Sequence, residues 1–281
     1  MKEIQFTKMH GLGNDFILVD GVVKKLPRLR WSNLAVRICR RLTDVGGDGL
    51  IVILPSRKAD FRMRIFNSDG SEAEMCGNGF RCMIRYLRDK RYTSMSSIPV
   101  QTLAGRITGE IVKSVESDYQ VKVAMGSPEF RAEKIPVKTS KPELIESRLR
   151  VGSDSYIVTA VSMGNPHVVL FVDSLKMDWK TLGAKLENHQ LFPERANVEF
   201  VRVLNRRKIE MISWERGAGP TMASGTGACA AVAAGIKTGR LNYKVGVNFE
   251  LGSLIVEYDK TENMIYKTGP AEYCFSGTYY Y

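Results

Sequence analysis

The pattern of hydrophobic positions predicts a helix over residues 80–87. Apolar side chains stand at positions 80, 83, 84 and 87, which is the spacing of one face of a helix. The intervening residues include Arg81, Arg85 and Arg88, and we expect these arginines to point largely away from the apolar face. The pattern therefore predicts an amphipathic helix.

A second helix is predicted over residues 228–237. This run is almost entirely small and apolar and is followed by Gly239, a residue typical of a helix end. Such a helix has no polar face to present to water. We expect it to be enclosed by the rest of the fold.

Most of the remaining chain alternates apolar and polar residues with period two, which is typical of β-strands. The alternation is clear in residues 119–125 and 247–251. Two further strand-like segments, residues 61–66 and 208–214, each precede a glycine-rich turn and one of the predicted helices.

These elements occur in a repeated order. The segment 13–20 is echoed by 164–173, since each is a Gly-Asn turn followed by an apolar strand that ends in Asp. At nearly the same distance further along, Cys76–Gly79 is echoed by Ser224–Gly227. Repeated supersecondary units indicate repeated architecture.

We therefore predict an α+β fold of two pseudo-symmetric domains, each a curved mixed β-sheet around a central helix. The boundary is expected near residues 125–129, where a strand pattern ends in turn residues. The expected N-terminal domain is 1–125 plus 270–281 and carries Cys76. The expected C-terminal domain is 126–269 and carries Ser224.

Composition and charge narrow the class of protein. With 281 residues, 44% hydrophobic and 25% charged, the chain is typical of a soluble globular protein. We expect no membrane partner, because no apolar run approaches the roughly 18 residues of a membrane span. The N-terminus lacks a signal-peptide core, so we expect a cytoplasmic location.

The formal net charge of +11 suits nucleic acid or an acidic ligand. However, the basic residues cluster in short stretches typical of solvated helix faces and turns, and no aromatic-interleaved RNA motif lies near them. We expect no nucleic-acid partner.

The five cysteines are scattered, contain no CxxC pair and are accompanied by three histidines. This argues against a disulfide framework and against a metal site. The chain also lacks a phosphate loop, a GxGxxG turn after a strand, an HExxH motif and an obvious Ser-His-Asp signature. We therefore expect no cofactor.

One cysteine stands at the start of a predicted helix. Cys76 begins a Cys-Gly-Asn-Gly turn, where backbone N–H groups converge and the helix N-terminus favours negative charge. A thiol in such a place tends to ionise at neutral pH. For the other four cysteines we expect no reactive role: Cys39, Cys82, Cys229 and Cys274.

The thiol and the duplication together point to a reaction. Two equivalent helix starts facing one another across a cleft would hold a single carboxylate and place one side chain on either side of its α-carbon. Opposed acid/base groups of this kind are what stereoinversion requires. Backbone N–H donors would stabilise the negative charge that builds on the carboxylate. The second position, however, is Ser224 rather than a cysteine.

Six sequence blocks resemble those of the diaminopimelate epimerase family. They run in the family order from residue 6 to residue 229 and cover most of the chain. The blocks are residues 6–16, 66–72, 76–82, 164–167, 194–197 and 215–229.

The resemblance implies a pyridoxal-independent epimerase that interconverts LL- and meso-diaminopimelate with two thiols, for lysine and peptidoglycan precursor synthesis. It also implies two pseudo-symmetric domains with the active site between them, a small-molecule amino-acid substrate and a homodimer. Carried over by position, Cys76 is one catalytic residue and Ser224 takes the place of the other. His167 and Glu215 are implied to tune the proton affinity of the catalytic pair.

The resemblance also implies a set of substrate-binding residues. Arg216 suits the distal carboxylate of the substrate, and carbonyl or amide oxygens suit its ammonium group. The implied residues are Asn14, Asn67, Gly77, Asn78, Asn165, Asn197, Glu215, Arg216, Gly225 and Thr226.

Two positions depart from the family. Some members carry a polar side chain that reaches the site where this chain has Gly49. The other departure is Ser224, because an alcohol holds its proton at neutral pH and so we expect impaired activity. Either the family's cysteine has been replaced deliberately, to trap a complex or to prevent a disulfide between the facing thiols, or the serine belongs to a natural paralogue that has diverged in activity. Alternatives are a racemase of another amino acid such as histidine, a non-catalytic amino-acid-binding paralogue, and a basic nucleic-acid-binding protein.

Overall fold

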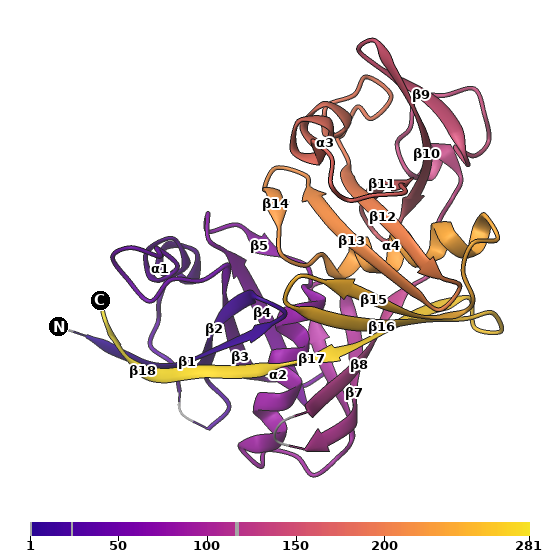
Figure 1. The fold of residues 1–281 in the computed structure, drawn as a ribbon. Coiled ribbons are helices and arrows are strands. Elements are labelled where there is room, and N and C mark those ends of the chain that lie inside the picture. The colour runs from indigo at the N-terminus through magenta and orange to yellow at the C-terminus, as the bar shows by residue number, and fades with distance from the viewer. Residues whose placement is uncertain (1, 24, 116–117) are drawn as a thin grey trace. The chain divides into compact units, whose positions relative to one another are not determined.

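The computed structural model describes residues 2–23, 25–115 and 118–281 and divides the chain into two compact units. Unit 1 is Met1–Ala124 with Thr268–Tyr281, and unit 2 is Met125–Lys267 (Figure 1). The helices and strands of unit 1 are β1 (Glu3–Gly11), β2 (Asn14–Asp20), α1 (Trp31–Ile38), β3 (Gly49–Pro55), β4 (Phe61–Asn67), β5 (Glu72–Ala73), α2 (Gly77–Asp89), β6 (Ser97–Thr102), β7 (Gly105–Val115), β8 (Asp118–Gly126) and β18 (Glu272–Tyr280).

Unit 2 has the same order of elements. They are the short helix η1 (Ala132–Lys134), β9 (Ser147–Val151), β10 (Asp154–Ser162), β11 (Pro166–Phe171), α3 (Trp179–Glu187), β12 (Asn197–Asn205), β13 (Lys208–Glu215), β14 (Gly219–Thr221), α4 (Gly225–Lys237), β15 (Lys244–Phe249) and β16 (Gly252–Asp259). Strand β17 (Met264–Pro270) spans the end of unit 2 and the return of the chain to unit 1.

The strand pairings show that the two units are repeats of one plan. In unit 1, β1 and β2 are antiparallel, β2 and β3 parallel, β3 and β4 antiparallel, and β4 and β6 parallel. In unit 2 the same succession runs through β10, β11, β12, β13 and β15. Each sheet is therefore mixed, and the predicted α+β fold of two similar halves is confirmed.

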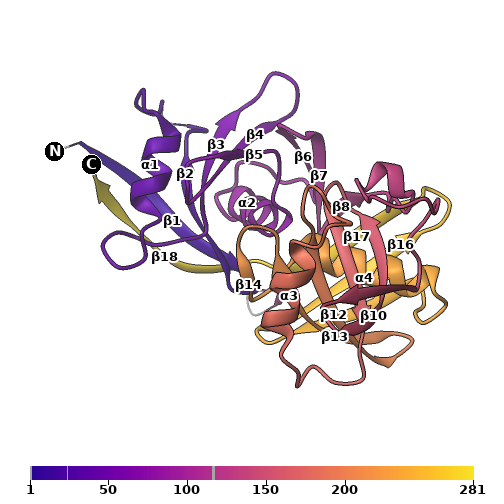
Figure 2. The same ribbon diagram turned by 90° about the horizontal axis from the view of Figure 1, so that it is seen from above.

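Each sheet lies between a short helix on one face and a longer, buried helix on the other. In unit 1, α1 packs on β3 and β4, while α2 contacts β1, β2, β3 and β7 (Figure 2). In unit 2, α3 packs on β12, β13 and β14, while α4 contacts β10, β11, β12 and β16. Because both faces are covered, the central strands are buried on both sides: residues 15–19 and 49–53 are all buried.

The hydrophobic cores between the short helices and the sheets follow from this layering. Leu34, Ala35 and Ile38 of α1 pack with one face of β2 and β3, which carries Ile17 and Leu50. Leu182 and Leu186 of α3 take the corresponding place in unit 2. Residues 227–235 of α4 are all buried, so the prediction of an enclosed second helix is confirmed.

The prediction for the arginines of the first helix is wrong for two of the three. Arg81 is completely buried and Arg85 is 9% exposed. Arg81 Nε donates to the Pro270 carbonyl oxygen at 3.0 Å, and Arg85 Nη1 donates to that of Ala271 at 2.6 Å. The returning C-terminal segment covers this face of α2, which the local periodicity does not reveal.

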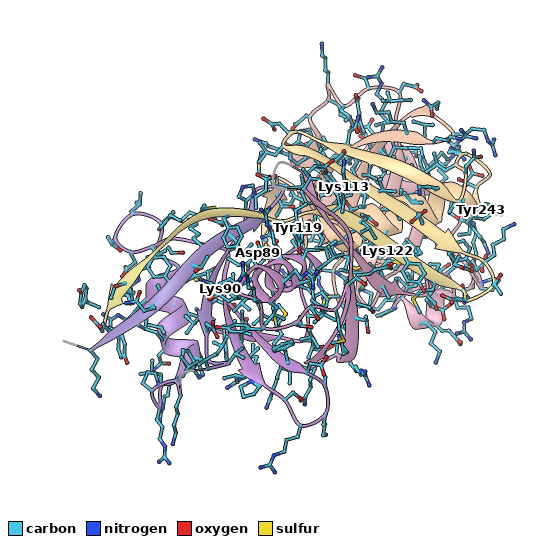
Figure 3. All side chains as sticks on the ribbon, turned by 90° about the horizontal axis from the view of Figure 1, so that it is seen from below. Asp89, Lys90, Lys113, Tyr119, Lys122 and Tyr243 are labelled. Carbon is cyan, nitrogen blue, oxygen red and sulfur yellow. The ribbon has the colours of Figure 1, made fainter. Side chains whose placement is uncertain are left out.

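The C-terminal end of α2 is covered in a similar way. The Arg85 guanidinium lies 4.7 Å from the ring centroid of Tyr119 on β8 and 5.1 Å from that of Tyr273 on β18. Figure 3 shows Tyr119 beside Asp89 at this end of the helix. The stacking lets a buried cation lie among aromatic rings.

The two ends of the chain lie side by side in unit 1. β18 pairs antiparallel with β1 from Glu3 opposite Tyr280 to His10 opposite Glu272, and the Tyr281 N–H donates to the Lys2 carbonyl oxygen at 2.9 Å. No helix in the described part of the chain is both long enough and apolar enough to cross a membrane.

We predict that Phe80→Ala destabilises the protein by about 3 to 5 kcal/mol, because the Phe80 side chain, in the first turn of α2, is fully buried and its loss leaves a cavity. Chemical denaturation measures the change. Leu42→Ala is the control, since Leu42 is 99% exposed and its truncation should change stability by about 0.5 kcal/mol or less. Equal effects of the two substitutions would contradict the packing of α2 described here.

Candidate active site

Cys76 is the residue immediately before α2. Its backbone is extended (φ −135°, ψ 118°), its carbonyl oxygen accepts from the Phe80 N–H at 2.8 Å, and its side chain makes no capping hydrogen bond. The helix begins at Gly77, three residues before the first apolar position of the predicted helix. The partly exposed thiol thus stands at the helix start, where backbone N–H groups favour an anion.

Asn14 and Asn78 lie beside this thiol. Cys76 Sγ is 3.7 Å from Asn14 Oδ1, and the same oxygen accepts from Asn78 Nδ2 at 3.1 Å. Arg81 Nη1 in turn donates to Asn78 Oδ1 at 2.9 Å, which fixes the amide of Asn78. A fully buried cation therefore lies one side chain away from the amide pair that faces Cys76.

The other side of Asn14 is held by Asp48. Asn14 Nδ2 donates to Asp48 Oδ2 at 2.7 Å, so Asn14 Oδ1 is left to face the thiol. Asp48 is itself fixed, because its other oxygen pairs with Arg41 at 2.6 Å and Arg41 also pairs with Asp15 at 2.7 Å. Lys8 completes the group at 2.9 Å from Asp15.

Asn67 ends β4 and is exposed, and its Nδ2 donates to Ser71 Oγ at 2.9 Å. It is paired with Gly49 across the sheet. A Cβ atom added at Gly49 would lie 2.8 Å from the Phe66 carbonyl oxygen, so this backbone has no room for a side chain without moving.

Ser224 takes the corresponding place in unit 2, immediately before α4, but its side chain is used differently. Its Oγ accepts from the Gly227 N–H at 3.1 Å, which caps the helix. Ser224 is 2% exposed, whereas Gly225 and Thr226 after it are partly exposed. Serine is a good N-cap residue and cysteine is not among the preferred ones.

Beneath the first turn of α4 lies a buried polar group. His167 Nδ1 is 2.9 Å from Glu199 Oε1, and His167 Nε2 is 3.0 Å from Asn165 Oδ1. Ser213 Oγ donates to Glu199 Oε2 at 2.5 Å. The side chains of His167 and Glu199 are both fully buried.

Asn197, Glu215 and Arg216 gather where β12 begins and β13 ends. Asn197 Nδ2 donates to the Pro166 carbonyl oxygen at 2.9 Å, and Asn197 Oδ1 accepts from the Arg216 N–H at 2.9 Å. The Arg216 guanidinium is exposed, with Nη1 donating to the Glu194 carbonyl oxygen at 3.0 Å. Glu215 Oε1 accepts from Thr221 Oγ1 at 2.6 Å.

The turn that carries Arg216 is supported by Glu187 of α3. One carboxylate oxygen of Glu187 accepts from the Gly217 N–H at 2.8 Å, and the other accepts from Trp214 Nε1 at 2.7 Å. Glu187 is 6% exposed. Its two bonds hold both sides of the turn.

The sheet registers make the residues of the two units equivalent. In unit 1, Phe16 lies opposite Gly49, and Gly49 lies opposite Asn67. In unit 2, His167 lies opposite Asn197, and the next residue, Val198, lies opposite Trp214. Counting from these pairs, the equivalent site positions are Asn14 and Asn165, Gly49 and Asn197, Asn67 and Glu215, Cys76 and Ser224, and Asn78 and Thr226.

The remaining cysteines lie outside these groups. Burial raises the pKa of the Cys39 and Cys82 thiols to about 12, so both stay protonated at neutral pH. Cys229 is buried and Cys274 is exposed. Partial burial nevertheless raises the pKa of the Cys274 thiol. In the described part of the chain, no three His, Cys, Asp or Glu side chains are placed to hold a metal ion.

Sequence reasoning missed the residues that orient the site: Arg41, Asp48, Arg81, Glu187, Glu199 and Ser213. A signal was present for one of them, because Glu199 places a charge inside the otherwise apolar run 198–201. The partners of Asp48 and Glu187 come from distant segments and leave no local pattern.

Comparison with known proteins places the chain in a family. The model of the diaminopimelate epimerase family matches residues 6–131 and 159–274. A relative from Desulfitobacterium hafniense, named diaminopimelate epimerase, is 47% identical over 98% of this chain and 97% of its own. The chain belongs to the diaminopimelate epimerase family. It is accordingly an isomerase, as the resemblance of the sequence blocks implies.

Further relatives agree with this membership. The diaminopimelate epimerase of Moorella thermoacetica is 46% identical over 98% of this chain and 99% of its own, and that of Pelotomaculum thermopropionicum is 46% identical over 99% of both. These names do not favour a racemase of another amino acid.

Solved structures show how widely the fold of this epimerase family occurs. A hydroxyproline epimerase from Agrobacterium vitis matches with a TM-score of 0.72 at 15% identity, over 99% of this chain and 91% of its own. A phenazine biosynthesis protein of the PhzF family from Bacillus anthracis matches with a TM-score of 0.71 at 19% identity, over the whole of both chains. At these identities the likeness concerns the fold alone.

We predict that Asp15→Asn removes the part of this epimerase's folding stability that is otherwise lost as the pH falls. Burial alone would raise the pKa of Asp15, but hydrogen bonds and charges from Arg41 and Lys8 outweigh it and hold the pKa below its ordinary value of 3.8. A depressed pKa stabilises the fold above the unfolded value and loses that contribution as pH falls through the folded value. Below pH about 4, thermal melting of the variant should therefore depend less on pH than that of the parent.

Asp60→Asn is the control for this prediction, because Asp60 is an exposed carboxylate of the same unit. Its melting curve should follow the parent at every pH. An acid dependence of Asp15→Asn identical to that of the parent would show that the Lys8, Arg41, Asp15 and Asp48 group does not hold Asn14 in solution.

Proposed function

We propose that this chain interconverts LL- and meso-diaminopimelate without a cofactor, by proton transfer at the α-carbon. The observation that carries the proposal is the equivalence of the two helix starts: Cys76 before α2 and Ser224 before α4 occupy the same position in two copies of one fold. Inversion needs one group to remove the α-proton and another to deliver a proton on the opposite face. A duplicated fold with one acid/base side chain per unit supports that arrangement.

In this proposal each unit is one epimerase domain and contributes half of the binding groups. The reacting carboxylate is held by backbone N–H groups at Gly77 and Asn78 of unit 1 and at Gly225 and Thr226 of unit 2. Such donors are strongest toward the charge that develops in the transition state.

The remaining site residues bind and orient the substrate. Arg216 pairs with the distal carboxylate, since an exposed guanidinium on a braced turn is suited to bidentate binding. Asn14, Asn67, Asn165, Asn197 and Glu215 supply amide and carboxylate oxygens for the distal ammonium group or orient their neighbours, and His167 and Glu215 tune the proton affinity of the catalytic pair.

Ser224 limits the rate in this proposal. Its Oγ is engaged as a helix cap and its hydroxyl holds its proton at neutral pH, so it is a poor base. Cys76 retains the thiol at the other helix start. The chain should therefore exchange the α-proton of one stereoisomer faster than it inverts either.

A free Cys76 thiol requires a reducing compartment, and for that reason we propose a cytoplasmic location. The lack of a thiol at Ser224 raises the alternative of a non-catalytic amino-acid-binding paralogue, which the names of the relatives do not favour. It would bind diaminopimelate and show no exchange at all.

We predict that Ser224→Cys raises the rate of inversion by about 10²- to 10⁴-fold, the usual contribution of one acid/base group. The same change should lower thermal stability, since replacing a serine cap costs about 0.5 to 2 kcal/mol. NMR in heavy water follows α-proton exchange on each separate stereoisomer, with parent and variant side by side.

Ser224→Ala is the matched control, because it removes the cap without adding a thiol, and it should lose stability without gaining activity. Full-rate inversion by the parent chain would contradict the assignment of Ser224 as the weaker of two acid/base groups. Binding without exchange by every variant would favour the non-catalytic candidate.

We also propose that the chain forms a homodimer through β18. This strand runs along the outer side of β1 (Figure 1) and exposes Tyr273, Phe275 and Tyr280 at 39%, 50% and 56%. The Phe275 ring meets only one aromatic neighbour, Phe6, at 5.9 Å between centroids, among the ring pairs of the described residues. Exposed aromatic side chains on a sheet margin are typical of an interface.

We predict that Phe275→Glu converts a dimer into a monomer, because a charge in the centre of a two-fold interface is buried twice without a partner. Sedimentation velocity measures the mass. Leu42→Glu, at a position exposed elsewhere on unit 1, should leave the dimer intact. A dimer that survives Phe275→Glu would show that copies associate through another surface.

A further inference from the structure

The two units differ in what lies under the first turn of their central helices. In unit 2 this place is polar: His167 and Glu199 are 0% exposed and Ser213 is 1% exposed. In unit 1 the equivalent positions in the register are all apolar, and they are Phe16, Ile51 and Ile65.

The close approach of helix and sheet is the same in both units. A Cβ at Gly79 would lie 2.8 Å from Ile51 Cδ1 and 3.4 Å from the Phe16 ring. A Cβ at Gly227 would lie 2.5 Å from the Glu199 carboxylate. The carboxyl group of Glu199 therefore occupies the space that an isoleucine side chain fills in unit 1.

The polar version is not needed for packing. Burying ionisable side chains costs stability unless they are paired, and well-packed apolar residues are often equally or more stable in the same place. Unit 1 shows that the same fold packs well with apolar residues at the equivalent positions. A polar version that persists in one unit alone points to a chemical role.

The hydrogen bonds define how many protons the group holds. His167 Nε2 faces Asn165 Oδ1, an acceptor, so this nitrogen carries a proton. Ser213 donates to Glu199 Oε2. One further proton then lies between His167 Nδ1 and Glu199 Oε1, which are 2.9 Å apart.

The surroundings favour the charged form of this pair. The first turn of α4 has no acidic residue and presents its positive end to Glu199. Of the ionisable groups in the described residues, His167 is the one paired with this carboxylate, and the hydroxyl of Ser213 supplies its remaining hydrogen bond. An imidazolium paired with a carboxylate satisfies every one of these contacts.

We propose that Glu199, supported by Ser213, is a positioning residue that keeps His167 doubly protonated and aims its Nε2–H at Asn165. Fixed in this way, Asn165 presents its amide to the substrate from the unit that carries Ser224. The role of this site in catalysis rests on the proposed function, but the protonation state of His167 can be measured without any substrate.

The test is the ¹⁵N NMR spectrum of His167 in Glu199→Gln. Glutamine keeps the shape but has no charge, so the ring becomes neutral: the glutamine amide donates to Nδ1, and Nε2 keeps the proton that it donates to Asn165. We expect the parent at pH 7 to show two protonated ring nitrogens and the variant to show an unprotonated Nδ1. A neutral His167 in the parent, or an unchanged spectrum in the variant, overturns the proposal.

Two controls separate this effect from a general disturbance. Glu210→Gln changes a partly exposed carboxylate on the neighbouring strand β13, paired with Arg202 at 3.2 Å, and should leave the His167 spectrum unchanged. Ser213→Ala removes one hydrogen bond from Glu199 while keeping its charge, and His167 should stay doubly protonated.

A second variant keeps the inference testable if glutamine is not tolerated. The triple change His167→Phe, Glu199→Ile and Ser213→Ile copies the apolar group of unit 1 into unit 2. It should fold with a melting temperature equal to or above that of the parent. Exchange of the diaminopimelate α-proton, measured in the Ser224→Cys background, should fall by about 10- to 100-fold, the usual cost of losing the residues that orient an active-site group.

The experiments distinguish a failure of the role of Glu199 from a failure of the proposed epimerase function. Undiminished exchange in the triple variant overturns the role of Glu199. Absence of exchange in the Ser224→Cys background itself would refute the proposed function while leaving the NMR test of the His167–Glu199 pair intact.

Discussion

The site in each unit depends on the close contact between the first turn of a central helix and the sheet beneath it. Glycine makes that contact possible, because any side chain at Gly79 or Gly227 would collide with the strand residues below. The helix start is thereby held against β2 and β3 in unit 1 and against β11 and β12 in unit 2. Residues on those strands and residues at the helix start then meet, although they are far apart in sequence.

The same contact explains how two copies of one fold come to differ chemically. In unit 1 the helix rests on hydrocarbon, and the polar groups near Cys76 lie at its margin, in Asn14, Asp48 and Asn78. In unit 2 the helix rests on a carboxylate that is bonded to an imidazole. Fold duplication therefore preserves the position of the two side chains that precede the central helices while allowing each to have its own electrostatic surroundings.

The sequence was sufficient for the plan of the fold and for the residues at the two helix starts. The helix period, the strand alternation and the two repeated turns each depend on neighbouring residues, so they can be recognised in one dimension. The burial of Arg81 and Arg85 was not predictable in this way, because their partners are the carbonyl oxygens of Pro270 and Ala271, nearly two hundred residues later. Helical periodicity alone marks such arginines as solvent-facing.

The supporting residues of the site were missed for a similar reason. Asp48 lies in a turn that looks like any glycine-rich loop, and only the tertiary structure shows that it holds Asn14. Ser224 was recognised as a departure from the family, but its use as a helix cap follows from the backbone geometry at Gly227. Sequence identifies residue types at motif positions, whereas orientation comes from contacts between segments.

The return of the C-terminal strand to the first unit has a consequence for synthesis of the chain. Residues 125–267 form one compact unit, while β1 lacks its partner β18 until residues 272–280 leave the ribosome. The buried guanidinium groups of α2 likewise lack the carbonyl oxygens of Pro270 and Ala271 until those two residues emerge. The half that is made first must therefore be the half that is completed last.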